Sequence, residues 1–251
     1  IGFVGNPNCG KTLLFNLLTG SNYKVANYPG VTVEKREGLW ELAPNKQCTL
    51  LDLPGLYSLT GGSPDEEVAR RVLLGLDGGP PPDAVVVVIS ATALEQGLFL
   101  CSQLLDCSLP LILVLTMVDL ARANETTFAL STLGNAVDAP VVAVHATERW
   151  GLQELAKQCT QVLQNKRKPN RELVWVADAA VFKNSLQSVA AAISETVPEI
   201  PKPALLIYAG MLLSGSAWSP SQVALEKLHR LQHVTRHEND RVGYCGIMAA
   251  S

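Results

Sequence analysis

The sequence predicts an α/β domain with a mostly parallel sheet and helices on both faces, followed by a small all-helical domain. Over residues 1–165, short β-branched runs alternate with amphipathic segments, the pattern of strand–helix units around a parallel sheet. The composition changes abruptly at the basic segment 165–171, and no strand pattern returns beyond it. We therefore place the two domains at residues 1–165 and 166–251.

Four continuous apolar runs predict the buried strands of this sheet, since helices on both faces make a strand apolar on both sides. They are Ile1–Gly5, Ala84–Ile89, Leu111–Leu115 and Val141–Val144. A hairpin at one side of the sheet is predicted from Leu39–Leu42 and Thr49–Asp52, with Pro44 and Asn45 at its turn.

Helical periodicity predicts the remaining elements. In the first domain the helices are Lys11–Thr19, Pro64–Leu76, Leu94–Leu105, Asn124–Leu133 and Leu152–Leu163. In the second domain they are Leu173–Val197, Pro203–Leu213, Pro220–His233 and Arg241–Ala250.

The composition excludes several classes of protein. With 47% hydrophobic and 17% charged residues the chain is globular, and a net charge of −3 gives no general attraction to nucleic acid, which we do not expect as a partner. Six scattered cysteines without a C-x-x-C pair favour free thiols. The longest apolar runs, Ala84–Ile89 and Ala204–Leu213, are shorter than the ~20 residues that span a bilayer. Because the chain starts within a strand pattern and stops after a helical one, we expect it to be a piece of a longer protein.

A phosphate-binding motif follows the first predicted strand. Residues 5–12 spell G-N-P-N-C-G-K-T, which matches G-x-x-x-x-G-K-[ST] in the required strand–loop–helix context. Backbone N–H groups of such a loop face phosphates, Lys11 adds a charge at the β and γ phosphates, and Thr12 is expected to ligate Mg²⁺. The predicted phosphate contacts are Gly5, Asn6, Pro7, Asn8, Cys9, Gly10, Lys11 and Thr12.

Two further segments are expected at the γ-phosphate. The sequence D-L-P-G ends the third strand, where Asp52 can hold Mg²⁺ through water and the Gly55 N–H can contact the γ-phosphate. Leu53 and Pro54 of the same segment are also predicted to contact the nucleotide. In the loop 27–34, N-Y-P-G-V-T-V-E, Thr32 is the predicted switch threonine for Mg²⁺. Gly30 and Val31 are predicted to contact the nucleotide beside it, although a short strand is an alternative explanation of this segment.

The segment T-M-V-D, residues 116–119, occupies the place of the guanine motif [NT]-K-x-D. The Asp119 carboxylate can accept hydrogen bonds from N1–H and the N2 amine of guanine, a pair that adenine lacks, so GTP is favoured over ATP. Thr116 replaces the usual Asn, which we expect to weaken the link to the phosphate loop, and Met117 offers the base an apolar cover.

A last segment, V-H-A-T at residues 144–147, departs from the usual S-A-[KL] of this guanine site. Its backbone N–H at Ala146 can still reach guanine O6, and His145 and Thr147 are predicted to lie beside the base. These departures predict a modest nucleotide affinity.

Together, G-N-P-N-C-G-K-T, V-A-N-Y-P-G-V-T-V-E-K-R-E-G, D-L-P-G-L-Y-S-L and the P-D-E-E start of the next helix resemble the N-terminal cytosolic part of FeoB, the bacterial ferrous-iron transporter. The likeness is dense over residues 1–75 and looser to 165. The segment E-N-D-R-V-G-Y-C-G-I-M-A near the end resembles the helix that precedes the membrane portion of that family.

The resemblance implies a P-loop GTPase of Ras-like fold at the cytoplasmic face of the inner membrane, followed by a helical domain that favours GDP and by a transmembrane iron pathway. It also implies a K⁺ ion that replaces an arginine finger, held by Asn8 and the carbonyls of Ala26 and Tyr28. Lys11, Thr32, Gly55 and Asn8 are then the residues expected to act in hydrolysis. The oligomeric state stays open, a homo-oligomer included.

Leu56 follows D-L-P-G, where Ras-like enzymes place a water-orienting glutamine, so hydrolysis is expected to be slow. Switch backbone groups, aided by Asp65 or Glu66, are expected to hold the water.

Two alternative functions remain: a potassium-dependent GTPase of ribosome assembly or tRNA modification, and a nucleotide-gated switch with little turnover. His229, His233 and His237 are four residues apart and can ligate a metal if they share a helix face, although a solvated stripe explains them as well.

Overall fold

The computed structural model describes residues 1–28, 31–59, 62–77, 79–107, 109–123, 129–165, 180–198, 200, 205 and 208–209. The chain divides into two compact units, residues 1–59 with 63–170, and residues 60–62 with 171–251. The domain boundary between residues 165 and 166 stays a prediction from the sequence.

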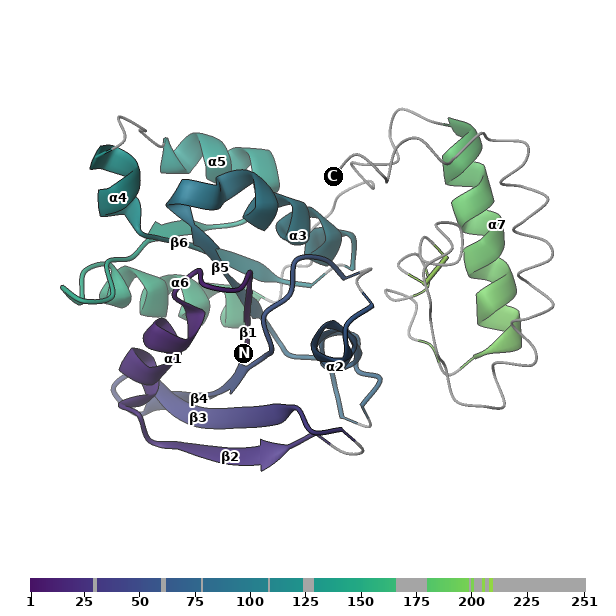
Figure 1. The fold of residues 1–251 in the computed structure, drawn as a ribbon. Helices are drawn as coiled ribbons and strands as arrows, with labels where there is room; N and C mark the ends of the chain where they lie inside the picture. The colour runs from purple at the N-terminus through teal and green to yellow at the C-terminus, as the bar shows by residue number, and fades with distance from the viewer. Residues whose placement is uncertain are drawn as a thin grey trace. The chain divides into compact units, whose positions relative to one another are not determined.

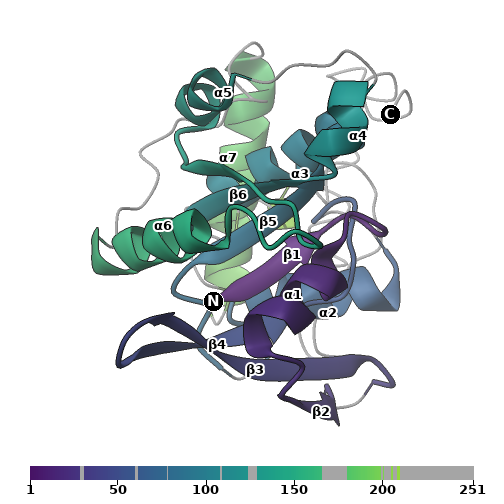
Figure 2. The same cartoon turned by 90° about the vertical axis from the view of Figure 1, so that its left-hand side faces the viewer.

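A seven-stranded sheet forms the centre of the first unit, in the order β2-β3-β4-β1-β5-β6-β7 (Figures 1 and 2). The parallel strands are β4 (Lys46–Asp52), β1 (Gly2–Gly5), β5 (Val85–Ser90), β6 (Leu111–Thr116) and β7 (Val141–Ala143). Strands β2 (Tyr23–Asn27) and β3 (Glu34–Ala43) add an antiparallel side to it. The predicted fold class is confirmed.

Helices cover both faces because alternate residues of each central strand point to opposite sides. Val86 and Val88 of β5 belong to a core cluster with Phe15 of α1 (Lys11–Thr19) and Leu155 of α6 (Leu152–Asn165). On the other face Ile89 lies against α3 (Leu94–Asp106), which follows the 3-10 turn η1 (Ala91–Ala93). Every residue of β5 and β6 is buried, as their continuous apolar runs predict.

The predicted helix start at Pro64 is confirmed, and this helix ends at Leu73 instead of the predicted Leu76. Helix α2 (Pro64–Leu73) begins at the N-cap Ser63, whose side chain accepts from the Glu66 N–H while the Glu66 carboxylate accepts from the Ser63 N–H. Proline at the first helical position completes this capping box, because it has no N–H that needs a partner.

The helix predicted at Asn124–Leu133 is wrong in its bounds. The structure has α4 at Val118–Ala123 and α5 at Leu130–Val137, and residues 124–128 lie outside the described part. Strand β2 was not predicted, and β3 begins five residues before the predicted Leu39. Strand β2 is mostly exposed, and the missed start of β3 is charged and exposed or half-buried over residues 34–37, so neither segment has a continuous apolar run.

The second unit contains α7 (Ala180–Thr196), within the predicted segment Leu173–Val197. Its buried residues Leu186, Val189, Ala190 and Ile193 follow helical spacing. Apart from helical residues 205, 208 and 209, the segment Pro203–Leu213 lies outside the described residues, as do the two later predicted helices and the three histidines.

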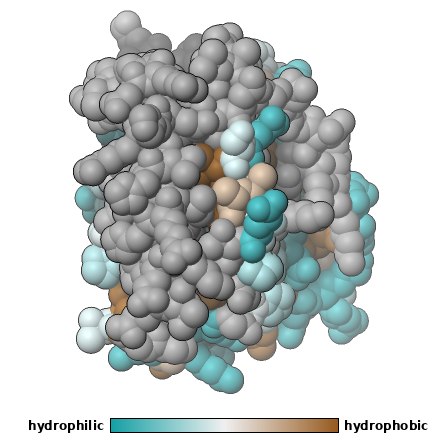
Figure 3. Space-filling view, turned by 90° about the vertical axis from the view of Figure 1, so that its right-hand side faces the viewer, coloured by the Kyte–Doolittle hydropathy of each residue, from teal (hydrophilic) through white to brown (hydrophobic). Residues whose placement is uncertain are grey.

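No helix in the described part of the chain has the length and apolar character of a membrane span. Among the described residues visible in Figure 3, hydrophilic side chains predominate, with small hydrophobic spots between them.

Candidate nucleotide-binding site

The phosphate loop lies between β1 and α1, at the carboxyl end of β1, where its backbone needs glycine. A Cβ on Gly5 would lie 2.4 Å from the Val88 carbonyl oxygen and 2.8 Å from the Cys9 sulfur. Gly10 caps α1 with a φ of 84°, in the left-handed region. Cys9 is a buried filler of this turn, and burial raises the pKa of its thiol.

Lys11 and Asp52 form a buried ion pair in this loop, with exposed fractions of 9% and 6%. Lys11 starts α1 and Asp52 ends β4, so two segments 41 residues apart meet at one edge of the sheet. Two charges removed from water need each other as counterions. The site therefore joins an ammonium group, which suits phosphate, with a carboxylate, which suits Mg²⁺.

Asn6 adds a buried amide that suits a further ligand. Its side-chain oxygen and nitrogen have no hydrogen-bond partner within the described residues. Such groups are costly to bury unpaired, by about 1–3 kcal/mol. Its neighbour Gly5 accepts a hydrogen bond from the Leu56 N–H at 3.2 Å, and a Cβ on Gly55 would lie 3.3 Å from the Cγ of Pro7. The D-L-P-G turn therefore packs directly on the phosphate loop.

Thr116 links the end of β6 to the phosphate loop. Its hydroxyl oxygen lies 2.7 Å from the carbonyl oxygen of Cys9 and 3.2 Å from that of Ile89, and its side chain is buried. The structure therefore joins Thr116 to the phosphate loop by a hydrogen bond. That threonine makes a weaker link here than asparagine stays a prediction.

We expect Thr116→Val to destabilise the domain by about 1–3 kcal/mol, since valine keeps the shape but leaves the Cys9 carbonyl without its donor. Chemical unfolding of both proteins measures this difference. Thr49→Val, at an exposed position of β4, is the matched control and should change stability by less than about 0.5 kcal/mol. Equal stability of Thr116→Val and the wild type would contradict a role for the hydroxyl.

Asp119 faces His145 at the predicted base-binding end. The carboxylate oxygen Oδ2 lies 3.6 Å from Nε2 of the imidazole, while Nδ1 accepts the Glu148 N–H at 3.2 Å. A neutral imidazole then carries its proton on Nε2, toward Asp119. The backbones of His145 and Trp150 exchange two hydrogen bonds, at 3.1 and 3.2 Å, which closes the loop that contains Ala146 and Thr147.

The predicted switch loop is open to solvent. Val31 and Thr32 are exposed, and Gly30 lies outside the described residues. The Tyr28 carbonyl accepts a hydrogen bond from the Val31 N–H at 3.3 Å. The Tyr28 side chain is buried, which raises the pKa of its phenol. Ala26 pairs with Lys35 across β2 and β3. Among the described residues, no hydrogen bond joins Thr32 or the carbonyls of Ala26 and Tyr28 to the phosphate loop.

Glu66, which we expected to help hold the water, is already engaged. One of its oxygens accepts from the Tyr57 N–H at 3.3 Å and the other from Ser63. Asp65, beside it in the first turn of α2, is exposed. Leu56 is fully buried and belongs to the core.

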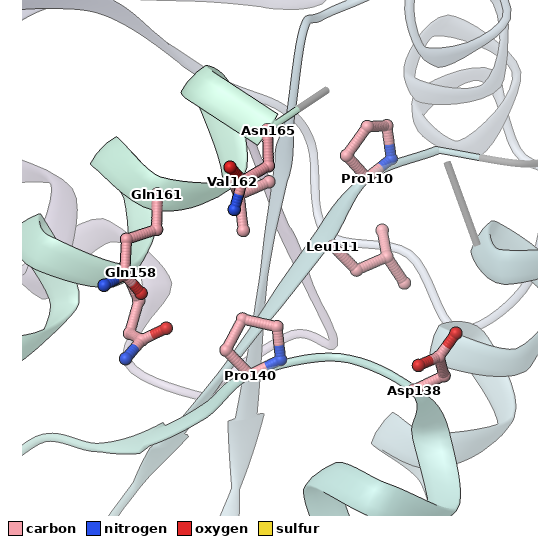
Figure 4. Close-up of a pocket in the computed structure, with 8 residues that line it drawn as sticks. All are labelled: Pro110, Leu111, Asp138, Pro140, Gln158, Gln161, Val162 and Asn165. Atoms are coloured by element: carbon pink, nitrogen blue, oxygen red, sulfur yellow. The ribbon is translucent and has the colours of Figure 1, made fainter. Parts of the chain in front are cut away.

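A separate cavity of about 190 Å³ lies at the opposite edge of the sheet, where β6 begins (Figure 4). In this view, side chains of α6, including Gln158, lie on one side of the cavity and Asp138, after the end of α5, lies on the other. Leu111 and Pro140 lie between them. Nucleotides bind at the carboxyl ends of parallel strands, so this cavity is not the nucleotide site.

The comparisons with known proteins agree on one family. The family model of ferrous iron transport protein B matches residues 1–159. The Fe(2+) transporter FeoB of Leptospira biflexa is 39% identical over 187 residues, 74% of this chain and 26% of the relative. That of Escherichia coli K12 is 36% identical over 202 residues, 79% and 25% respectively. The chain thus spans about a quarter of the length of these relatives.

Solved structures agree over more of the chain. The cytosolic domain of the T. maritima FeoB iron transporter in GDP form I has a TM-score of 0.73 at 28% identity, covering 95% of both chains. The E67A mutant of S. thermophilus NFeoB bound to GDP has a TM-score of 0.74 at 27% identity, covering 94% of this chain and 89% of the other.

Proposed function

Because the chain belongs to the ferrous iron transport protein B family, we propose that it binds GTP with Mg²⁺, hydrolyses it slowly and so regulates ferrous iron uptake by a FeoB-type transporter. The observation that carries this proposal is the buried pair of Lys11 and Asp52 at the phosphate loop, on the same edge of the sheet as Asp119. A phosphate ligand, a Mg²⁺ ligand and a guanine reader there suit one nucleotide.

Each residue has a distinct part in the proposed reaction. Lys11 neutralises charge on the transferred phosphoryl group, and Mg²⁺ supplies a second positive charge there, held by Thr12, Thr32 and, through water, Asp52. The Gly55 N–H binds the γ-phosphate. Since buried Leu56 cannot orient water, the water is held by switch backbone groups, and turnover is slow.

The remaining parts of the proposal follow from membership of the family. The helical second domain favours bound GDP, and a C-terminal membrane part of the same protein carries iron, so that this chain acts at the cytoplasmic face of the bacterial inner membrane. The bound nucleotide then controls the membrane part. A nucleotide-gated switch with little turnover is the rival, which single-turnover hydrolysis distinguishes.

Base choice tests the proposed GTP site. Asp119→Asn should weaken GTP binding at least tenfold, because an amide cannot accept from both N1–H and the N2 amine of guanine, and one lost charged hydrogen bond is worth about 1.5–3 kcal/mol. ATP binding should hardly change. Fluorescent GTP and ATP analogues measure both affinities, with Asp83→Asn, exposed before β5, as control. Equal losses for the two nucleotides would place the guanine reader elsewhere.

A further inference from the structure

Two buried polar side chains hold the backbone of Leu59, four residues after Gly55. The Leu59 N–H donates to Oε1 of Gln103 at 2.7 Å, and its carbonyl accepts from the Arg70 guanidinium at 2.9 Å. Gln103 on α3 has an exposed fraction of 5% and Arg70 on α2 of 1%. Buried polar groups seldom go unpaired, so these contacts fix both partners in place.

Neighbouring residues strengthen this arrangement. The Ser58 hydroxyl lies 3.2 Å from Oε1 and 3.0 Å from Nε2 of Gln103. Arg70 also pairs with Glu67 one helical turn away, which keeps its guanidinium charge balanced within the interior. Two helices thereby hold Ser58 and Leu59.

The other end of this segment lies at the phosphate loop. Asp52 belongs to β4, and the Leu56 N–H donates to the Gly5 carbonyl at 3.2 Å. Gly55, which binds the γ-phosphate in the proposed function, therefore lies on a short piece of chain fixed at both ends. Fixing both ends reduces the number of conformations that the Gly55 N–H can adopt.

We propose that Gln103 is a positioning residue for GTP hydrolysis, which acts with Arg70 by holding Ser58 and Leu59 so that Gly55 meets the γ-phosphate. This role rests on the proposed GTPase function. GDP has no γ-phosphate, so its binding does not use the held segment. A loss confined to the hydrolytic step therefore separates this role from a general loss of structure.

Gln103→Met tests the proposal, because methionine fills a similar volume without polar atoms. We expect kcat for GTP to fall about tenfold, as small misplacements of reacting groups cost this much or more, with GDP affinity within twofold of the wild type. Hydrogen exchange of the segment 55–59 should be faster. Ser102→Ala is the matched control, since this half-buried serine lies beside Gln103 and its hydroxyl donates within its own helix, to the Phe99 carbonyl.

The outcomes separate this role from the function on which it rests. A wild type without GTP turnover overturns the proposed function and this role with it. If the wild type hydrolyses GTP and a folded Gln103→Met variant has the same kcat, the positioning role is overturned and the proposed function stands. If Gln103→Met does not fold, Gln103→Glu keeps an acceptor for the Leu59 N–H and loses the donor to Ser58. Its kcat should fall two- to fivefold, and an unchanged kcat overturns the role.

Discussion

Replacing Lys11 with methionine is expected to lower GTP hydrolysis at saturating GTP and Mg²⁺ by about 100- to 1000-fold, the usual loss when one preorganised charge-stabilising group is removed. Lys11 is the first residue of α1, beside the phosphate loop, and is the cation that we propose for the phosphates. Methionine keeps most of the length of the unbranched side chain and removes the ammonium group, with its charge and its three N–H donors. Phosphate release under multiple-turnover conditions measures the effect.

Because Lys11 also pairs with Asp52, the stability of the variant must be measured beside its activity. Without Lys11 the Asp52 carboxylate is buried and unpaired when no nucleotide is bound, which costs about 3–5 kcal/mol. The double variant Lys11→Met/Asp52→Asn should recover most of this stability and none of the activity. Lys46→Met, exposed at the β3–β4 turn, is the control for both measurements. Hydrolysis by Lys11→Met within fivefold of the wild type would remove Lys11 from the reaction.

The central part of the fold was predictable because its signals are continuous. Strands β5 and β6 are unbroken apolar runs, and α1 is preceded by a motif whose glycines are needed by the turn itself. The outer strands β2 and β3 have no such continuous apolar run. The segment 34–37 that begins β3 carries four charged residues in succession, and β2 is exposed at four of its five positions. Pairing to a neighbour, rather than burial, makes these segments strands.

The same distinction applies to the site. Gly5–Thr12 is contiguous, so its motif identifies it from sequence. Gln103 and Arg70 reach Leu59 from 44 and 11 residues away, and a glutamine or arginine in an amphipathic helix suggests an exposed face. Only the packing of α2 and α3 shows that both are buried. The sequence shows that His145 departs from the usual guanine motif. That His145 lies close to Asp119 follows only from the structure, in which its loop is closed by pairing with Trp150.

Potassium is expected to accelerate GTP hydrolysis about 10- to 100-fold over sodium, less than the roughly 10³–10⁵ that a protein arginine finger supplies. Leu56 is fully buried and cannot orient water, so we expect a bound cation to add positive charge at the phosphates beside Lys11 and Mg²⁺. Asn8 is exposed in the phosphate loop at a φ of 64°. Its amide oxygen is a neutral ligand of the kind that a large monovalent cation takes.

We expect the carbonyls of Ala26 and Tyr28 to complete this K⁺ site. The Tyr28 carbonyl accepts one hydrogen bond, from Val31, and a carbonyl oxygen has two lone pairs, so one remains for a cation. Hydrolysis in KCl and in NaCl at equal ionic strength measures the effect, and Asn8→Ala should abolish the difference. Asn45→Ala is the matched control, because this exposed asparagine of the β3–β4 turn has a φ of 61° and suffers the same backbone strain. Equal wild-type rates in the two salts would refute the cation, and the water would then be activated by switch backbone groups alone.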